Sequence, residues 1–158
     1  MADQSLILLA REVRGRTLWQ LDGLSDEQAR FAAPGLRNSI LWHAGHALLV
    51  VEHLAVMRLA DSKEICYPPD WWDKFGWQSD PQTVTSWPAL NEVRAHLARQ
   101  LPRLISLIES ADEARLGRLD ADGNSARFEV VHGLHDEALH AGEMYLLRKM
   151  LKVRRGDR

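Results

Sequence analysis

Polar side chains that can bind metals or transfer protons recur at helical spacing in residues 128–151, FEVVHGLHDEALHAGEMYLLRKML. His132, Asp136 and His140 follow one another at intervals of four, and such positions differ by only about 40° around a helix axis. Glu143 continues on the same side. Unpaired polar groups on a buried face are costly, so these side chains either pair with one another or hold a ligand. We expect this side to face inward, because it also carries Phe128, Leu139, Leu146, Leu147 and Met150.

A second group of histidines lies in residues 38–61, where His43 and His46 share a heptad-like seam. His46 can meet Asp136 and His140 inside a helical bundle. Imidazole and carboxylate groups suit a divalent metal such as Zn or Ni, and three protein ligands leave positions open for water or substrate. A buried network of histidines and carboxylates explains the same pattern without an ion, and the residues alone leave both readings open. The seam also carries Ser39, Val50, His53 and Met57.

Four amphipathic segments must position these side chains. Apolar residues recur at helical spacing in residues 3–21, 38–61, 86–111 and 125–151. The sequence contains no run typical of a strand and no internal repeat. We therefore predict an all-α protein, a four-helix bundle that forms a single domain over residues 1–158. The long connection between the second and third helices would let those two helices run parallel.

Residues 62–86 form that connection, and three prolines and a glycine predict that it holds no regular element. Its central part, residues 66–80, is rich in aromatic side chains. We expect this loop to be ordered and to cover one end of the bundle near the histidines, because so much apolar surface is unfavourable in water. Packing alone, without a ligand, is the alternative role for its tryptophans. The connection at residues 25–37 predicts a short helical turn at most, and that at 113–124 predicts a loop.

Composition narrows the classes of function. The net charge of -2, without a basic cluster in the body of the chain, gives no case for nucleic-acid binding. The apolar runs are too short to predict a membrane span. A single cysteine, Cys66, excludes an internal disulfide and fits a reducing compartment, so we predict a cytoplasmic protein. The first two helical segments carry further apolar residues outside the one face that each is expected to bury, and these residues predict a homodimer. They are Leu8, Trp19, Trp42 and Leu49.

Three short motifs resemble those of the DinB-like superfamily. WHAGH at residues 42–46, followed by Glu52, resembles the W-H-x-G-H segment of that family. DEALHAGE at residues 136–143 resembles its C-terminal H-E-x-x-H-x-G-Q segment, and WDKFGW at residues 72–77 resembles its aromatic loop. The resemblance implies a four-helix bundle, often dimeric, that binds a divalent metal through three side chains. Relatives include thiol S-transferases that use bacillithiol and a mycothiol-dependent maleylpyruvate isomerase.

Carried over residue by residue, the resemblance implies a metal held by His46, His140 and Asp136, although the family usually has histidine at the third position. The neighbouring polar residues are predicted to support these ligands or to replace one of them. His132 would replace or orient a ligand, and His43 would hold the tautomer of a ligand. Glu143 would accept a hydrogen bond from His140 or act as a base. The remaining histidines, His53, His96 and His135, are expected at edges or on the surface.

Two functions follow. The first is a metal-dependent thiol S-transferase or hydrolase that acts on a small molecule, with a low-molecular-weight thiol as a co-substrate. The second is a non-enzymatic, stress-related binding or interaction bundle with a vestigial polar site.

Overall fold

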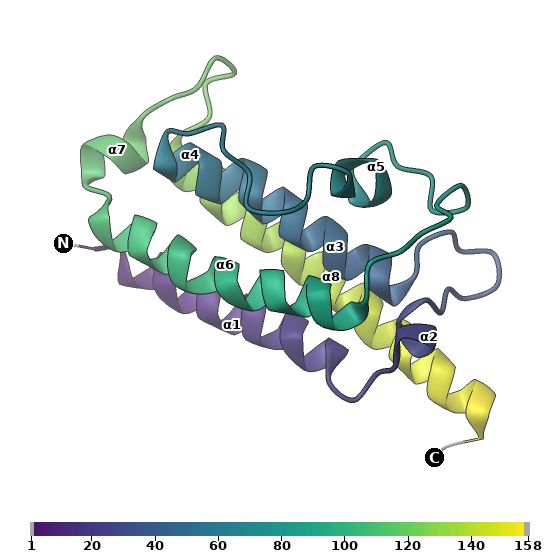
Figure 1. The fold of residues 1–158 in the computed structure, drawn as a ribbon. Coiled ribbons are helices and arrows are strands. Elements are labelled where there is room, and N and C mark those ends of the chain that lie inside the picture. The colour runs from purple at the N-terminus through teal and green to yellow at the C-terminus, as the bar shows by residue number, and fades with distance from the viewer. Residues whose placement is uncertain (1, 157–158) are drawn as a thin grey trace.

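The computed structural model describes residues 2–156, which form a bundle of helices (Figure 1). Within these residues no strand forms, so the predicted all-α class is confirmed; one isolated bridge pairs Leu119 with Ser125. The long helices are α1 (Gln4–Leu21), α6 (Leu90–Ser110), α8 (Ala126–Arg155) and a continuous segment made of α3 (Ile40–Val51), the π-helical turn η1 (Glu52–Val56) and α4 (Met57–Ala60). Shorter helices occupy the connections: α2 (Asp26–Ala29), α5 (Trp71–Phe75) and α7 (Glu113–Gly117).

Side-chain caps fix where three of the long helices begin. Asp3 accepts hydrogen bonds from the first turn of α1, Ser39 from the Trp42 amide of α3, and Ser125 from the Phe128 amide of α8. Such caps satisfy backbone donors that have no partner within the helix. The two serine caps agree with the starts predicted from the sequence.

Helix α6 begins later than the sequence predicts, at Leu90 rather than near Ser86. The cap residue Ala89 has no side chain that can accept a hydrogen bond. Instead, the Leu90 amide donates to the carboxylate of Asp26 in α2, at 2.8 Å. A cap supplied by a distant segment leaves no local signal, which explains the misplaced start.

Two core clusters define the directions of the long helices. One contains the C-terminal end of α1 with the N-terminal ends of α3 and α6, represented by Leu21, Ile40 and Leu90. The other contains the opposite ends of the same helices. Helices α3 and α6 therefore run parallel to each other and antiparallel to α1 and α8, as Figure 1 shows. The long connection after α4 makes this arrangement possible, as predicted.

Helix α3 is buried on all sides, between α6 and α8 and beneath α5. By length and composition alone, Ile40–Ala60 is apolar enough to cross a membrane. In the structure, however, 83% of its apolar 18-residue stretch is buried inside the protein, as is typical of a core helix.

Helix α8 turns a different face inward from the one predicted. Four of the residues expected inside are exposed: Phe128, Leu139, Leu146 and Met150. The prediction was wrong because α8 carries apolar residues on several sides, and periodicity alone does not show which side meets the other helices. The stripe of Asp136 and His140 consequently lies at the margin of the interface with α3, half-buried rather than in the core. The buried face is formed by Val130, Leu134, Glu137, Ala141, Met144 and Leu147.

Two connections that were predicted to lack regular structure contain short helices. In α5, Trp71 and Phe75 lie one turn apart and are both buried, so tertiary packing stabilises a helix despite the nearby prolines. Helix α7 is capped by the carboxylate of Asp112, which accepts a hydrogen bond from the Arg115 amide. The aromatic loop is ordered, but its helix packs against the flank of α3 and does not cover an end of the bundle (Figure 1).

Candidate metal centre

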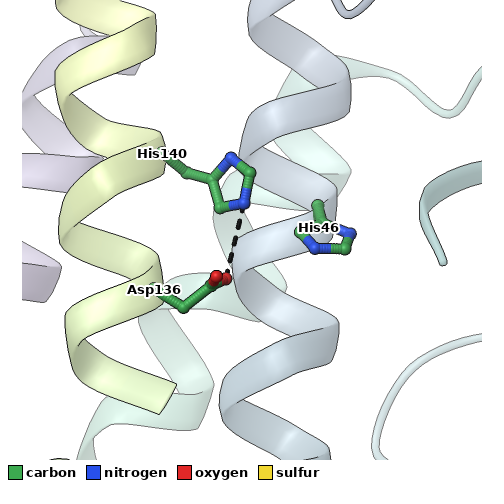
Figure 2. Close-up of side chains that lie close together, drawn as sticks. All are labelled: His46, Asp136 and His140. Carbon is green, nitrogen blue, oxygen red and sulfur yellow. Dashed lines mark ion pairs between the residues drawn. The ribbon is translucent and has the colours of Figure 1, made fainter. Parts of the chain in front are cut away.

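Three of the predicted site residues come together between two helices that are distant in sequence. His46 projects from α3, and Asp136 and His140 project from α8 (Figure 2). One potential ligand atom from each residue lies within 4.8 Å of the other two. Three atoms bound to a tetrahedral zinc ion at about 2.1 Å lie about 3.4 Å from one another, so separations of up to 4.8 Å would have to close by up to about 1.4 Å to complete the contacts.

The tautomer of His46 is fixed by the loop. Its Nδ1 lies 2.6 Å from the backbone carbonyl oxygen of Phe75, and a carbonyl can only accept, so Nδ1 carries the proton and donates. The neutral ring then has its free lone pair on Nε2. Trp42 stacks on the imidazole, with ring centroids 4.6 Å apart. Burial lowers the pKa of His46, which favours the neutral form that a metal requires.

Gly45 explains how the Phe75 carbonyl can reach His46. A Cβ atom at residue 45 would lie 2.3 Å from Cδ1 of the Phe75 ring, far inside van der Waals contact. Only glycine lets the ring pack directly on the α3 backbone. The glycine of the WHAGH motif thus positions α5, and sequence reasoning had assigned it no role.

Asp136 has a carboxylate oxygen that lacks a partner. Its Oδ2 is buried and makes no hydrogen bond with any described residue, although His140 Nε2 lies 3.4 Å away (dashed line in Figure 2). Contact with the His140 imidazole lowers the pKa of this carboxyl, so the group is ionised near neutral pH. A buried, anionic oxygen without a donor is destabilising unless a cation sits beside it. This orphaned atom, with two imidazoles beside it, fits a divalent metal.

His43 contacts Nδ1 of His140, whereas Asp136 lies beside Nε2 of the same ring. The two Nδ1 atoms are 2.8 Å apart, and His43 Nε2 is 3.6 Å from the Glu143 carboxylate. His43 is only 3% exposed, and burial, followed by the neighbouring His140 and His46, lowers its pKa to about 3. His43 is therefore neutral across the physiological range.

Two residues predicted to support the metal lie elsewhere than expected. His132 is exposed and lies against the Phe128 ring, outside the cluster, because the inward face of α8 is rotated away from it. Glu143 faces His43 rather than His140, since the Nδ1 atom of His140 is already engaged by His43.

The other histidines mostly follow the expectation that they lie at edges or on the surface. His135 and His96 are exposed or partly exposed, and the backbone oxygen of Cys66 lies 2.9 Å from His96 Nδ1. His53 is half-buried, with its Nε2 2.7 Å from the Tyr67 hydroxyl.

Aromatic residues of the loop form a wall beside His46. The ring of Trp77 meets the His46 ring edge-on at 5.7 Å, and Trp72 meets Trp77 at 5.1 Å. Both tryptophans are about half exposed. A hydrogen bond of 2.9 Å from Trp42 Nε1 to Ser79 Oγ holds the end of the loop against α3. The predicted position of the loop near the histidines agrees with the structure.

The fold and this cluster define a class: an all-α bundle with imidazole and carboxylate groups gathered between two facing helices, as in metal-binding bundles. The chain belongs to the DinB superfamily, because the family model of that superfamily matches residues 9–144. Metal binding is general in this superfamily.

A solved structure with the same fold is that of a conserved protein from Enterococcus faecalis. The TM-score is 0.69 over 94% of this chain and 96% of that chain, with 17% sequence identity. At this identity the likeness shows the fold alone. No curated protein matches the chain.

Proposed function

We propose that this protein binds one divalent metal, zinc or nickel, through Nε2 of His46, the carboxylate of Asp136 and Nε2 of His140. The observation that carries the proposal is the buried Oδ2 of Asp136, which has no hydrogen-bond partner among the described residues and belongs to a carboxylate with an oxygen within 4.8 Å of a ring nitrogen of each histidine. Two imidazoles and one carboxylate match the ligands that catalytic zinc prefers, and they leave positions open for other molecules.

We further propose that the bound metal serves a thiol S-transferase or hydrolase reaction on a small molecule. When bound, such an ion lowers the pKa of a coordinated thiol or water and supplies a nucleophile near neutral pH. The chain's own residues supply the rest of the site. Trp72 and Trp77 offer an apolar surface beside His46 that suits a small organic substrate. The Glu143 carboxylate is exposed at the rim, where it can accept a proton.

The test combines elemental analysis of purified protein with a screen of electrophilic small molecules against low-molecular-weight thiols and water. We expect one metal ion per chain and metal-dependent turnover, both lost in His46→Ala. His135→Ala is the matched control, since this histidine is exposed on α8 outside the cluster. Metal binding without turnover would favour the non-enzymatic binding bundle, and absence of metal would contradict the proposal.

We also propose that the protein is a cytoplasmic homodimer that uses the outer face of α1 and α8. Leu8 and Trp19 of α1 are 70% and 55% exposed, and Tyr145 of α8 continues this apolar surface beside Trp19. A second copy of the chain would remove it from water. Trp42 and Leu49, which were expected to contribute, are buried in the core, so they are excluded from the interface.

A further inference from the structure

The contact between His43 and His140 requires one ring to carry a proton on Nδ1 and the other to lack a proton there. Their Nδ1 atoms are 2.8 Å apart. A neutral imidazole carries one proton, on either Nδ1 or Nε2. In a hydrogen bond between two Nδ1 atoms, one ring must donate and the other must accept, so the two rings are opposite tautomers.

We propose that His43 is a positioning residue that accepts the Nδ1 proton of His140 and thereby keeps the Nε2 lone pair of His140 directed at the metal position. This inference rests on the proposed metal site. Nε2 of His140 is the atom that faces Asp136, at 3.4 Å, so it is the atom available to a metal. A metal on Nε2 requires the proton on Nδ1, and His43 Nδ1 is the acceptor within reach.

The tautomer of His43 follows from the same argument and agrees with its second contact. If Nδ1 accepts, the single proton of His43 lies on Nε2. That atom faces the carboxylate of Glu143 at 3.6 Å, and a carboxylate favours a donor opposite it. The sequence of groups Glu143, His43, His140 and metal therefore has one consistent set of proton positions, which runs from the rim to the centre of the site.

The side chain of His43 is well held for this role. It is 3% exposed between α3 and α8, and the Trp42 ring meets it edge-on at 5.3 Å. The Phe75 carbonyl performs the equivalent task for His46, so both candidate imidazole ligands have Nδ1 engaged and Nε2 free. With a metal on Nε2 of each ring, two unrelated acceptors, one from the loop and one from α3, would thus hold both ligands in the same tautomer.

The test is a matched pair of variants, His43→Asn and His43→Leu. The two replacements are nearly equal in size, but only asparagine keeps an oxygen that can accept the His140 proton near the former Nδ1 position. Zinc affinity is measured by competition with a chromophoric chelator. We expect His43→Leu to lose about 10–100-fold in affinity, the range typical of lost hydrogen bonds to metal-bound histidines, and His43→Asn to stay within about threefold of wild type. Equal affinity losses in both variants, or none in His43→Leu, would overturn the inference.

A second measurement uses the wild-type chain and does not depend on a variant that folds. Nitrogen–proton NMR of the histidine rings reports which ring nitrogen carries the proton, with and without zinc. We expect His140 to carry the proton on Nδ1 and His43 on Nε2 in the zinc-bound state, whereas in the metal-free chain the Asp136 carboxylate, 3.4 Å from His140 Nε2, favours a proton there. A zinc-bound chain in which His140 keeps its proton on Nε2, or His43 carries its proton on Nδ1, would refute the role of His43. Failure of the wild-type chain to bind zinc would instead refute the proposed function, while the metal-free spectrum still reads the tautomers.

Discussion

At the scale of single residues, the site depends on which atom of each side chain is free. The carboxylate of Asp136 adds a negative charge beside the imidazoles of His46 and His140. A divalent ion held there would keep a net charge of about +1 instead of +2. This lower charge weakens the activation of a bound thiol or water compared with an all-histidine site, but strengthens electrostatic attraction for the ion itself.

Replacement of Gly45 by alanine should damage both the packing and the site. The added Cβ would lie 2.3 Å from the Phe75 ring, so the ring must move and carry its carbonyl away from His46 Nδ1. We expect a loss of about 1–3 kcal/mol in unfolding free energy, the usual cost of overpacking, and weaker zinc binding. Denaturant unfolding and zinc titration measure the two effects.

Gly15→Ala is the control for that variant. Among the residues that the structure describes, nothing lies within 4 Å of a Cβ at position 15, on α1. Alanine there should be neutral or stabilise the helix by up to about 1 kcal/mol. Equal behaviour of the two alanine variants would contradict the role assigned to Gly45.

Burial of His43 predicts a specific dependence of stability on pH in the metal-free protein. The folded-state pKa is about 3, whereas the unfolded value is 6.5. Between these values the unfolded chain binds a proton that the folded chain does not, so the unfolding free energy falls as pH drops from about 6.5 toward 3. Each pH unit in this window costs about 1.4 kcal/mol at most.

His43→Asn removes that contribution without removing the hydrogen-bond acceptor. Urea unfolding of both metal-free proteins across this pH range should show a shallower decline for the variant. Identical slopes would mean that His43 is protonated or solvated in the folded state, contrary to its position in the structure.

At the scale of helices, a buried network around one ion pair joins all four long segments. Arg14 of α1 pairs with Glu137 of α8 at 2.6 Å, with both side chains almost fully buried, and also donates to Gln100 of α6 at 2.8 Å. Gln100 in turn donates to Glu52 at 2.7 Å. These contacts join α1, α6 and α8 to one another and to the segment from α3 to α4, and so hold the backbone that carries Asp136 and His140.

Arg14→Met should therefore be strongly destabilising, by about 3–5 kcal/mol, because it leaves the Glu137 carboxylate buried without a counter-charge. Adding Glu137→Leu should recover much of that loss, since the unpaired charge is then absent. Thermal or denaturant unfolding measures both. The control is Arg16→Met, whose partner Glu12 is exposed, and which should change stability by less than about 1 kcal/mol. A cost for Arg14→Met as small as that of the control would refute this account.

The sequence predicts the long helices better than it predicts their faces. Local caps such as Ser39 and Ser125, with strong periodicity, locate α3 and α8. Helix α5 escapes prediction because its stability comes from burial of Trp71 and Phe75 against α3, which is not a local property. The same reason explains why Arg14 and Glu137 were missed: a charged residue on a helix usually faces water, and only the assembled bundle shows that these two face each other.

The candidate ligands were predictable for a different reason. The spacing of Asp136 and His140 predicts a shared side of α8, and the resemblance to the superfamily selects His46 over His43. The structure brings the three side chains together, whereas metal binding stays a prediction. The supporting atoms were not predictable, because the Phe75 carbonyl and the orientation of His43 depend on how the loop and α8 pack against α3.

At the scale of the whole molecule, the exposed apolar face of α1 and α8 predicts self-association. Trp19→Glu places a charge in this face and should convert the dimer to a monomer, with the fold unchanged. Light scattering at micromolar concentration measures the mass. Leu36→Glu is the control, because Leu36 is similarly exposed but lies in the connection between α2 and α3. A wild-type chain that is already monomeric under these conditions would contradict the prediction.

The central claim is that His46, Asp136 and His140 together hold a metal ion. The most direct measurement is anomalous diffraction at the zinc absorption edge from crystals of the zinc-loaded protein. The account predicts one strong anomalous peak between α3 and α8, about 2.0–2.2 Å from Nε2 of His46, a carboxylate oxygen of Asp136 and Nε2 of His140. A peak that lacks any of these three contacts, or a site without a peak in crystals that contain zinc elsewhere, would contradict it.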